Sequence, residues 1–327
     1  MAFCDWLSIY QDHHGKQLPL INDGAVWAVD ANGEIDWRTD KKLDHVGSYD
    51  TKIRIKCDGS RVTVDGNISR FDRTDNIFGF TVRECVMRVN SLLKEFDLPP
   101  FTAQTEGYRG QKRVVDAAVL TRTDLTENYA TGGVNELTRL IHYLAGQDKG
   151  RRATVHQYGD NGVTWNEGSK YWYEKIYAKH ESLGDHVTPH LAEWVREQGI
   201  ARHEVSLKAR YLAQNNLRHI DNWEGQDMDN IVYGRFTEVL TRGTAVRSEL
   251  EDIPGRLGIL ANAWRAGKDL WGDTTYSERT RRMWRKQLLP YGIDIKQPSN
   301  IQRLQTRLQV VELQPVAAPA WYWNKAA

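Results

Sequence analysis

The clearest structural signal in the chain is the stretch Gly168-Ser169-Lys170-Tyr171-Trp172-Tyr173-Glu174-Lys175-Ile176-Tyr177-Ala178-Lys179-His180-Glu181-Ser182. Four aromatic residues and an isoleucine within seven positions predict a β-strand that runs into a short charged end. Successive side chains of a strand point to opposite faces of a sheet. One face therefore carries Tyr171, Tyr173, Lys175, Tyr177, Lys179 and Glu181, and the other carries Trp172, Glu174, Ile176, Ala178 and His180.

Tyr177 has a lysine two residues away on either side, Lys175 and Lys179. A free phenol has a pKa of about 10, so almost none of it is phenolate at neutral pH. Nearby positive charge favours the phenolate and also stabilises a phosphate that the phenolate attacks. The pattern therefore indicates a tyrosine nucleophile assisted by two ammonium groups. The alternative interpretation is an amphipathic strand with a solvated lysine face.

The composition is that of a globular protein with many aromatic residues. The chain has 327 residues, 12 Trp, 14 Tyr and a formal net charge of +1. This length suits one large domain or two ordinary ones. Because the net charge is close to zero, a nucleic-acid site has to come from local clusters of basic residues. Part of the aromatic surface is available to stack on unpaired bases.

Cys4, Cys57 and Cys85 are far apart and odd in number, and none belongs to a Cys-x-x-Cys pair. This spacing argues against a disulfide framework and a zinc site, and it favours a reducing cytosol. The N-terminal residues have no basic segment followed by an apolar run, so no signal peptide is expected. No stretch approaches the ~20 apolar residues that span a membrane, so no membrane partner is expected.

The rest of the pattern predicts an α+β fold built on an antiparallel sheet. Strands are expected at 3–11, in a meander over 24–70, and at 113–129, 154–158, 162–165 and 202–212. Periodic apolar residues predict helices at 81–96, 133–146 and 190–197. The order of elements over 111–225 loosely resembles that over 1–110. Residues 1–225 are therefore predicted to form one catalytic domain with an internal repeat.

The C-terminal third is predicted to be helical, with helices at 227–242, 255–267 and 277–289. The last helix is basic, and its candidate DNA-binding residues are Arg279, Arg282, Arg285 and Lys286. Short helices that end in a basic helix are typical of a helix-turn-helix unit, so residues 226–309 are a candidate DNA-binding region. An ordinary solvated helix face is the alternative. The tail at 310–327 contains prolines and small residues and is predicted to be flexible.

The segment from Gly66 to Gly79 is predicted to be a loop that joins the meander to the first helix. It contains three further candidate DNA-binding residues, Asn67, Arg70 and Arg73. A loop of this composition either holds phosphate or simply turns the chain.

Two other predicted strands place acidic residues in alternation. Asp124 shares a face with Arg122, and Glu204 shares a face with Arg202. If both strands neighbour the Tyr177 strand, the two carboxylates converge near the phenol. Such oxygen ligands suit Mg²⁺ or Mn²⁺, which would polarise the scissile phosphate. The alternative is that each carboxylate pairs with its own arginine. His13 and His14 are interpreted as a turn.

These pieces form a series along the chain. Gly-Asn-x-Ser-Arg-Phe and Asp-Asn-x-Phe-Gly lie within 66–79, and Thr-Arg-Thr-Asp-Leu-Thr-x-Asn-Tyr spans 121–129. Gly-Ser-Lys-Tyr-Trp-x-x-Lys-x-Tyr-x-Lys-x-Glu spans 168–181, and Arg-x-Glu-Val-x-Leu-Lys-x-Arg-Tyr-Leu spans 202–212. The series resembles the replication initiators of filamentous bacteriophages and the related plasmid rolling-circle initiators. The resemblance covers about residues 1–225 and returns at 263–270 and 291–295.

The resemblance implies a metal-dependent endonuclease and strand transferase that nicks one strand of a replication origin. A tyrosine joins the 5′-phosphate, leaves a 3′-OH primer and later reseals the displaced circle. By motif match, Tyr177 takes the place of the nucleophile and Lys179 that of the adjacent cation, while Asp124 and Glu204 match the metal positions. The implied fold is a five-stranded antiparallel sheet with helices, similar to the RRM-like sheet of other rolling-circle initiators.

The chain departs from many such initiators because it has no His-x-His. Tyr171 and Tyr173 share the face of Tyr177 and are alternative nucleophiles. The implied partners are single-stranded and duplex origin DNA, a host helicase and a host polymerase, in the cytosol of a host bacterium. Two other functions stay open: a non-catalytic replication or repressor protein that binds origin DNA, and a metal-dependent nuclease that acts through water.

Overall fold

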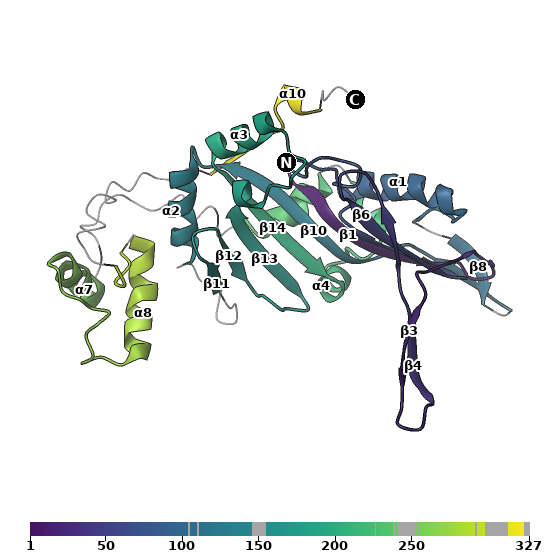
Figure 1. Cartoon of the computed structure of the whole chain (residues 1–327), viewed down its shortest axis with the longest axis horizontal. Helices are drawn as coiled ribbons and strands as arrows, with labels where there is room; N and C mark the ends of the chain where they lie inside the picture. The colour runs from purple at the N-terminus through teal and green to yellow at the C-terminus, as the bar shows by residue number, and fades with distance from the viewer. Residues whose placement is uncertain are drawn as a thin grey trace.

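The computed structural model describes residues 1–103, 105–109, 111–145, 155–225, 227–237, 240, 253, 255–291, 293–297 and 313–323. Its main body is an antiparallel sheet with helices packed against it, and a smaller helical unit follows (Figure 1). The predicted α+β class with an antiparallel sheet is confirmed.

The strands are β1 (Phe3–Asp12), β2 (Leu20–Ile21), β3 (Ala25–Val29), β4 (Ile35–Asp40), β5 (Leu43–Val46), β6 (Lys52–Asp58), β7 (Arg61–Gly66), β8 (Thr105–Arg109), β9 (Lys112–Asp116), β10 (Val119–Ala130), β11 (Val155–Tyr158), β12 (Gly162–Trp165), β13 (Trp172–Ala178), β14 (Ile200–Lys208) and β15 (Gln314–Pro315). The helices are α1 (Val82–Leu93), α2 (Val134–Ala145), α3 (Pro189–Gln198), α4 (Ala209–Gln214), α5 (Met228–Gly234), α7 (Gly255–Arg265), α8 (Glu278–Leu288) and α10 (Ala320–Trp323).

Among the described residues, eleven strands form one sheet in the order β11-β12-β13-β14-β10-β1-β7-β6-β2, with β5 paired to β6 and β15 to β10. The sheet is thus larger than the five strands that the resemblance implied. The long strands β1 and β10 pair antiparallel within it. The orders β1-β7-β6 and β10-β14-β13 are alike on the two sides of that pair, which is compatible with an internal repeat.

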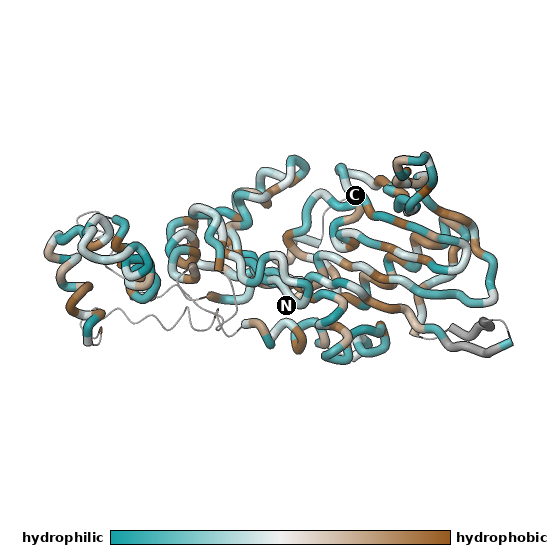
Figure 2. Tube along the Cα trace, turned by 90° about the horizontal axis from the view of Figure 1, so that it is seen from below, coloured by the Kyte–Doolittle hydropathy of each residue, from teal (hydrophilic) through white to brown (hydrophobic). Residues whose placement is uncertain are grey.

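The two faces of the sheet differ because side chains alternate along β10, β13 and β14. Leu125, Ile176 and Val205 lie on one face, in a core shared with apolar side chains of α1, α2 and α5. The opposite face of the same strands carries polar residues, described below. In Figure 2, hydrophobic and hydrophilic segments alternate along the strands. Burying one face under helices leaves the other available for a site.

α1 shows how local sequence builds this core. Thr81 and Glu84 form a capping box, in which each side chain accepts a hydrogen bond from the backbone N–H of the other residue. Its buried side chains then recur at helical spacing: Val82, Cys85, Val86, Val89 and Leu93. The helix is therefore started by its cap and held by its apolar stripe.

Two predicted elements differ from the structure. The strand expected over 113–129 is two strands, because β9 pairs with β8 in a separate hairpin and β10 enters the main sheet after Ala117 and Ala118. Alternation along one strand does not show where the chain changes its pairing partner. The helix expected over 227–242 is α5, which ends at Gly234; residues 241–242 lie outside the described residues.

β3 and β4 form a hairpin that projects from the body (Figure 1). Trp27 and Trp37 on this arm are 53% and 50% exposed, and Ile35 is 62% exposed. Part of the aromatic surface noted in the composition therefore lies outside the core.

α7 and α8 have a hydrophobic core of their own, which includes Trp264 and Trp284. α5 instead packs on the sheet body through Val232 and Tyr233. The separate core therefore lies beyond α5, whereas the sequence placed the boundary at 225. Residues 266–277 join α7 to α8. This connection is longer than the three- or four-residue turn of a helix-turn-helix, so the two helices do not form that motif.

The prediction of a flexible tail is wrong for residues 313–323, while 310–312 and 324–327 lie outside the described residues. β15 pairs with the end of β10, and Tyr322 of α10 is only 1% exposed. The prolines and small residues suggested disorder. The aromatic group Trp321-Tyr322-Trp323 nevertheless anchors the segment on the body.

All three cysteines are free and buried. Of the helices in the described parts of the chain, none combines the length and the apolar character needed to cross a membrane.

Candidate active site

β13 and β14 bring Tyr177 and Glu204 together on the polar face of the sheet. The strand register sets Lys175 opposite Glu204 and Tyr177 opposite Arg202. The Tyr177 hydroxyl donates a 2.6 Å hydrogen bond to Glu204 Oε1, and Lys175 Nζ lies 2.7 Å from Glu204 Oε2. The predicted convergence of Glu204 with the phenol is therefore present as a direct contact.

Tyr177 is partly buried, with cations near its ring. Lys175 Nζ lies 4.9 Å and Lys179 Nζ 6.0 Å from the ring centroid. Burial raises the pKa of Tyr177 well above its usual value; Arg202 opposes this rise, and Glu204 adds to it. The resting phenol is therefore protonated, and attack on a phosphate requires a base that takes its proton.

Glu204 lies in position to be that base, because it accepts the hydrogen bond of the Tyr177 hydroxyl. Its side chain is 6% exposed, and this burial by itself favours the neutral acid. Arg202 and Lys175 outweigh the burial and hold the pKa of Glu204 below its usual value. The carboxylate is therefore ionised while it accepts the hydrogen bond from Tyr177. A nucleophile hydrogen-bonded to its base is the arrangement that general-base catalysis needs.

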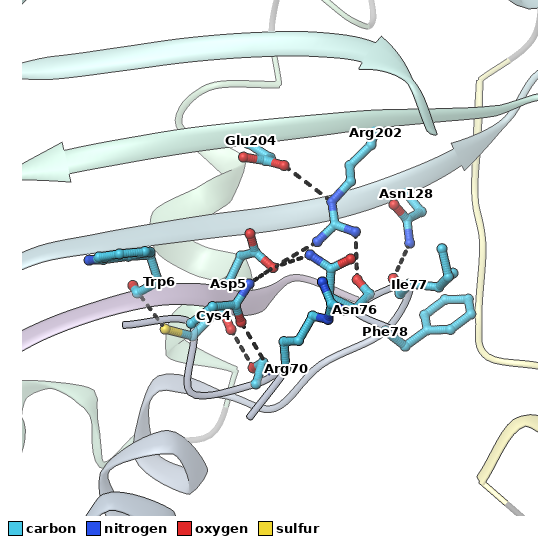
Figure 3. Close-up of polar contacts among 12 residues, drawn as sticks. Cys4, Asp5, Trp6, Arg70, Asn76, Ile77, Phe78, Asn128, Arg202 and Glu204 are labelled. Atoms are coloured by element: carbon cyan, nitrogen blue, oxygen red, sulfur yellow. Dashed lines mark hydrogen bonds and ion pairs between the residues drawn. The ribbon is translucent and has the colours of Figure 1, made fainter. Parts of the chain in front are cut away.

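Asp5 and Asn76 complete the site (Figure 3). Asp5 was expected on the first strand and Asn76 belongs to the motif Asp-Asn-x-Phe-Gly, but neither had a predicted role. Asp5 Oδ1 accepts three hydrogen bonds of 3.0 Å, from Asn67 Nδ2, Asn76 Nδ2 and Arg202 Nη2. Arg202 Nε lies 3.3 Å from Glu204 Oε1, and its side chain is 0% exposed. Asp5 thus neutralises the buried guanidinium and fixes it beside the proposed base.

Lys179 follows β13 in a 3₁₀ turn and is 3% exposed. Its Nζ donates a 3.1 Å hydrogen bond to Asn76 Oδ1. Burial lowers the pKa of Lys179 to about 7, and the charge of Arg202 contributes to the decrease. Near neutral pH this amine therefore exists in both charged and neutral forms.

Asp124 lies on β10, with β14 between it and the Tyr177 strand. Arg122 holds it through two hydrogen bonds, one of 2.8 Å from Nε to Oδ1, and Ser206 donates a third to Oδ1. Burial raises the pKa of Asp124, although Arg122 acts in the opposite direction. The alternative interpretation of this carboxylate, pairing with Arg122, is what the structure contains.

Asp124 and Glu204 do not fit a divalent cation as they are arranged. The oxygens of Asp124 already accept hydrogen bonds from Arg122 and Ser206. Those of Glu204 form ion pairs with Lys175 and Arg202 and accept a hydrogen bond from Tyr177. These cationic groups would repel a metal at the same oxygens. Binding of Mg²⁺ or Mn²⁺ by this pair stays a prediction.

Another possible ligand set is formed by Asp12, His14 and Asp116, whose ligand atoms lie within 4.8 Å of one another. Asp12 already forms a 2.6 Å ion pair with Arg61. Asp12 is seven residues from Asp5 on β1, roughly 20 Å along a strand at ~3.3 Å per residue. This cluster is therefore separate from the Tyr177 site.

The two alternative tyrosines have different surroundings. The Tyr171 ring packs against Tyr211 with centroids 5.1 Å apart. Tyr173 lies opposite Ser206, and burial, followed by Glu167, raises the pKa of Tyr173 to about 12. Of these three tyrosines, Tyr177 is the one that donates a hydrogen bond to Glu204, and its role as nucleophile stays a prediction.

The loop residues predicted to bind DNA mostly hold the loop itself. Asn67 Oδ1 accepts from the Arg70 backbone N–H at 2.9 Å, and its amide binds Asp5. Arg73 donates to Ser69 O and to the Tyr322 hydroxyl, both at 2.7 Å. Arg70 is partly exposed. DNA binding by this loop stays a prediction.

The basic residues of α8 divide into two groups. Arg279, Arg282 and Lys286 are exposed and follow one side of the helix. Arg285 instead forms two 2.8 Å hydrogen bonds with Asp294. Three of the four predicted residues are therefore exposed, and Arg282 among them forms a 2.6 Å ion pair with Glu278 one turn earlier.

The chain is similar to known replication proteins over most of its length. The family model that describes the N-terminal part of a phage replication-associated protein matches residues 4–226. The replication-associated protein of Escherichia phage If1 is 27% identical over 320 residues, which cover 83% of this chain and 97% of the relative. The protein of the same name from Enterobacteria phage I2-2 is 23% identical over 336 residues, covering 93% and 92%. A solved structure titled "Structure of Rolling Circle Replication Initiator Protein from Geobacillus stearothermophilus" matches with 13% identity and a TM-score of 0.28, covering 66% of this chain and 78% of that one.

Proposed function

The chain belongs to the family of phage replication-associated proteins, and from this premise we propose that it starts rolling-circle replication by nicking one strand of origin DNA with Tyr177. The matched range contains all the residues of the Tyr177 site. The motif series of the sequence and the geometry of that site support the same reaction.

The observation that carries the proposal is the 2.6 Å hydrogen bond from Tyr177 to Glu204. As the phenolic oxygen attacks phosphorus, its proton passes to Glu204 and a phosphotyrosine bond forms. The bond from phosphorus to the 3′ oxygen breaks, and that oxygen takes up a proton to become the 3′-OH primer. Reversal by a later 3′-OH reseals the strand without ATP, because the phosphotyrosine keeps the bond energy.

The surrounding cations have separate tasks in this reaction. Lys175 is 35% exposed, so it can turn from Glu204 towards a non-bridging phosphate oxygen. Lys179, when charged, adds positive potential 6.0 Å from the centre of the Tyr177 ring. Both stabilise the charge that develops on the phosphate. Arg202 is fully buried and held by Asp5, so it orients Glu204 rather than binding DNA.

The proposal also includes a contact between α8 and duplex DNA. Its exposed side chains Arg279, Arg282 and Lys286 lie on one side of the helix and are suited to phosphate contacts. Such contacts would hold the origin without reading its sequence.

The test compares the wild type with Tyr177→Phe on supercoiled DNA that carries the cognate origin. The wild type should give nicked circles with protein attached to the new 5′ end on a denaturing gel. Tyr177→Phe should form no adduct, because phenylalanine has no oxygen to attack, while its DNA affinity should stay unchanged. Tyr171→Phe and Tyr173→Phe are matched controls that should keep adduct formation.

Three results would contradict the proposal. Full activity of Tyr177→Phe would move the nucleophile elsewhere. Binding without nicking by the wild type would indicate a non-catalytic origin-binding protein. Nicking that leaves no protein on the DNA would indicate a nuclease that acts through water.

A further inference from the structure

We propose that the C-terminal segment Gln314–Trp323 belongs to the catalytic unit and that Tyr322 is a positioning residue for the Tyr177 site. Tyr322 acts through the loop that carries Asn76. The inference rests on the proposed nicking reaction and extends it to a segment that lies beyond the family match, which ends at residue 226.

The Tyr322 hydroxyl connects the two ends of the loop at 73–78. It accepts hydrogen bonds from Arg73 Nη2 at 2.7 Å and from the Phe78 backbone N–H at 3.2 Å. It donates a third hydrogen bond to Asp75 Oδ1. Asp75 Oδ1 also accepts from the Ile77 backbone N–H at 3.0 Å. One phenol from the C-terminal segment thus contacts residues on both sides of Asn76.

The segment is fastened to the body on both sides of this contact. β15 pairs with the end of β10, and the Val316 backbone N–H donates to Asn128 O at 2.9 Å. The Tyr322 ring meets Phe78 edge-on, with centroids 5.0 Å apart. It also shares a hydrophobic cluster with Leu191 and Val195 of α3, beside which α10 lies in Figure 1. This burial fixes the position of the hydroxyl.

Asn76 links the loop to the site. Its side-chain oxygen accepts from Lys179 Nζ at 3.1 Å, and its amide donates to Asp5 at 3.0 Å. Its backbone oxygen accepts from Arg202 Nη1 at 2.5 Å. Three groups of the site therefore depend on where the loop holds one residue.

The contacts of Tyr322 indicate that it positions the site and does not itself bind DNA. Tyr322 is buried, so removing its hydroxyl leaves the DNA-facing surface unchanged. A loop without this hydroxyl keeps its own turns but loses three bonds that select one conformation. Asn76 then holds Lys179 and Arg202 less firmly, so the step of phosphoryl transfer slows while affinity is kept.

The test uses Tyr322→Phe in the full chain, which keeps the buried ring. We expect single-turnover nicking at saturating DNA to slow by about tenfold, as for the loss of a buried hydrogen-bonding group. The Kd for origin DNA should stay within about twofold, and the pH profile of nicking should shift because Lys179 becomes better hydrated. Hydrogen exchange at the Phe78 amide, a donor to Tyr322, should become faster. Tyr276→Phe, on the helical unit against Trp284, is the matched control and should change none of these.

A double-mutant comparison tests whether the effect of Tyr322 on the site passes through Asn76. Because Tyr322 acts through Asn76, Tyr322→Phe should have little further effect on nicking in an Asn76→Ala background. Additive losses in the double variant would overturn the inference, and so would an unchanged rate and pH profile in the single variant. Both results leave adduct formation by wild-type Tyr177 intact. If the wild type forms no adduct, the proposed function fails instead, and only the exchange at Phe78 still reports on the segment.

Discussion

β13 and β14 carry a tyrosine–carboxylate contact on one face of the sheet and a comparable network on the other. On the sealed face, Glu174 Oε1 lies 2.7 Å from His203 Nε2, and both side chains are 0% exposed. His203 also contacts the hydroxyl of Tyr233, which lies 3.1 Å from the Tyr129 hydroxyl. The residues are those of an active site, but helices cover them.

On the open face, the Tyr177 hydroxyl donates directly to Glu204, where the sealed face has His203 beside Glu174. The two faces differ in access to solvent and in nearby charge. Lys175 is 35% exposed beside Glu204, and Tyr177 itself is only partly buried. A buried network of tyrosine, histidine and carboxylate is therefore not by itself evidence of an active site. It becomes a candidate for catalysis where a phosphate can reach it and cations surround it.

The strongest test of this difference exchanges one carboxylate on each face for its amide. Glu204→Gln should slow adduct formation on the order of 10²–10³-fold, because the phenol loses its proton acceptor. Glu174→Gln should lower the free energy of unfolding by about 1–3 kcal/mol, because it weakens the buried contact between the carboxylate and His203. Its adduct rate per folded molecule should stay near wild type. Single-turnover assays and urea unfolding measure the two effects, and equal rate losses in both variants would contradict the division between the faces.

The sequence was sufficient to predict which side chains share a face, since alternation is a local property of a strand. That reasoning placed Lys175 and Tyr177 on one face and Glu174 on the other. The contact between Tyr177 and Glu204 could be predicted only on the condition that their two strands are neighbours. The pairing of β13 with β14 meets this condition.

The supporting contacts were beyond this reasoning. Asp5 and Arg202 are 197 positions apart, and Tyr322 and Asp75 are 247 apart. No periodicity links positions so distant. The sequence contained one sign that the tail is ordered, the aromatic run at 321–323. Three adjacent aromatic residues are unusual in a disordered tail, although the proline and alanine residues before them favoured that interpretation.

On the open face, burial of the charged Lys179 amine lowers the free energy of unfolding, and a pH series can measure this cost. The pKa of Lys179 is about 7 in the folded chain and ~10.4 for an unperturbed lysine. Between these values the unfolded chain binds a proton that the folded chain has lost, so the free energy of unfolding rises with pH. Below about pH 7 the whole cost is present. Lys179→Met removes it and should be more stable than wild type at pH 7 by a few kcal/mol, on the order of 1.4 per pKa unit.

The advantage of Lys179→Met should shrink as the pH approaches 10, because the folded wild-type amine is then neutral and its burial no longer costs a charge, while the unfolded amine begins to lose its proton. Urea unfolding of both proteins between pH 7 and 10 isolates this group, since all other groups are shared. A difference in stability that does not change with pH would mean that Lys179 is already hydrated in the folded chain.

The smallest expected effect applies the distinction between exposed and partly buried side chains to α8. Arg282 is 71% exposed and pairs with the exposed Glu278, whereas Arg285 is 29% exposed and is held by the less exposed Asp294. Replacing Arg282 and Lys286 by Gln should reduce the slope of log Kd against log salt for duplex DNA by about 1–2, because up to two phosphate contacts disappear. Arg285→Gln is the matched control: it should leave this slope unchanged and weaken the helical unit by up to about 1 kcal/mol. If Arg285→Gln lowered the slope as much as the double variant, the ion pair with Asp294 would have to open on DNA, and side-chain exposure would no longer separate structural from DNA-binding arginines.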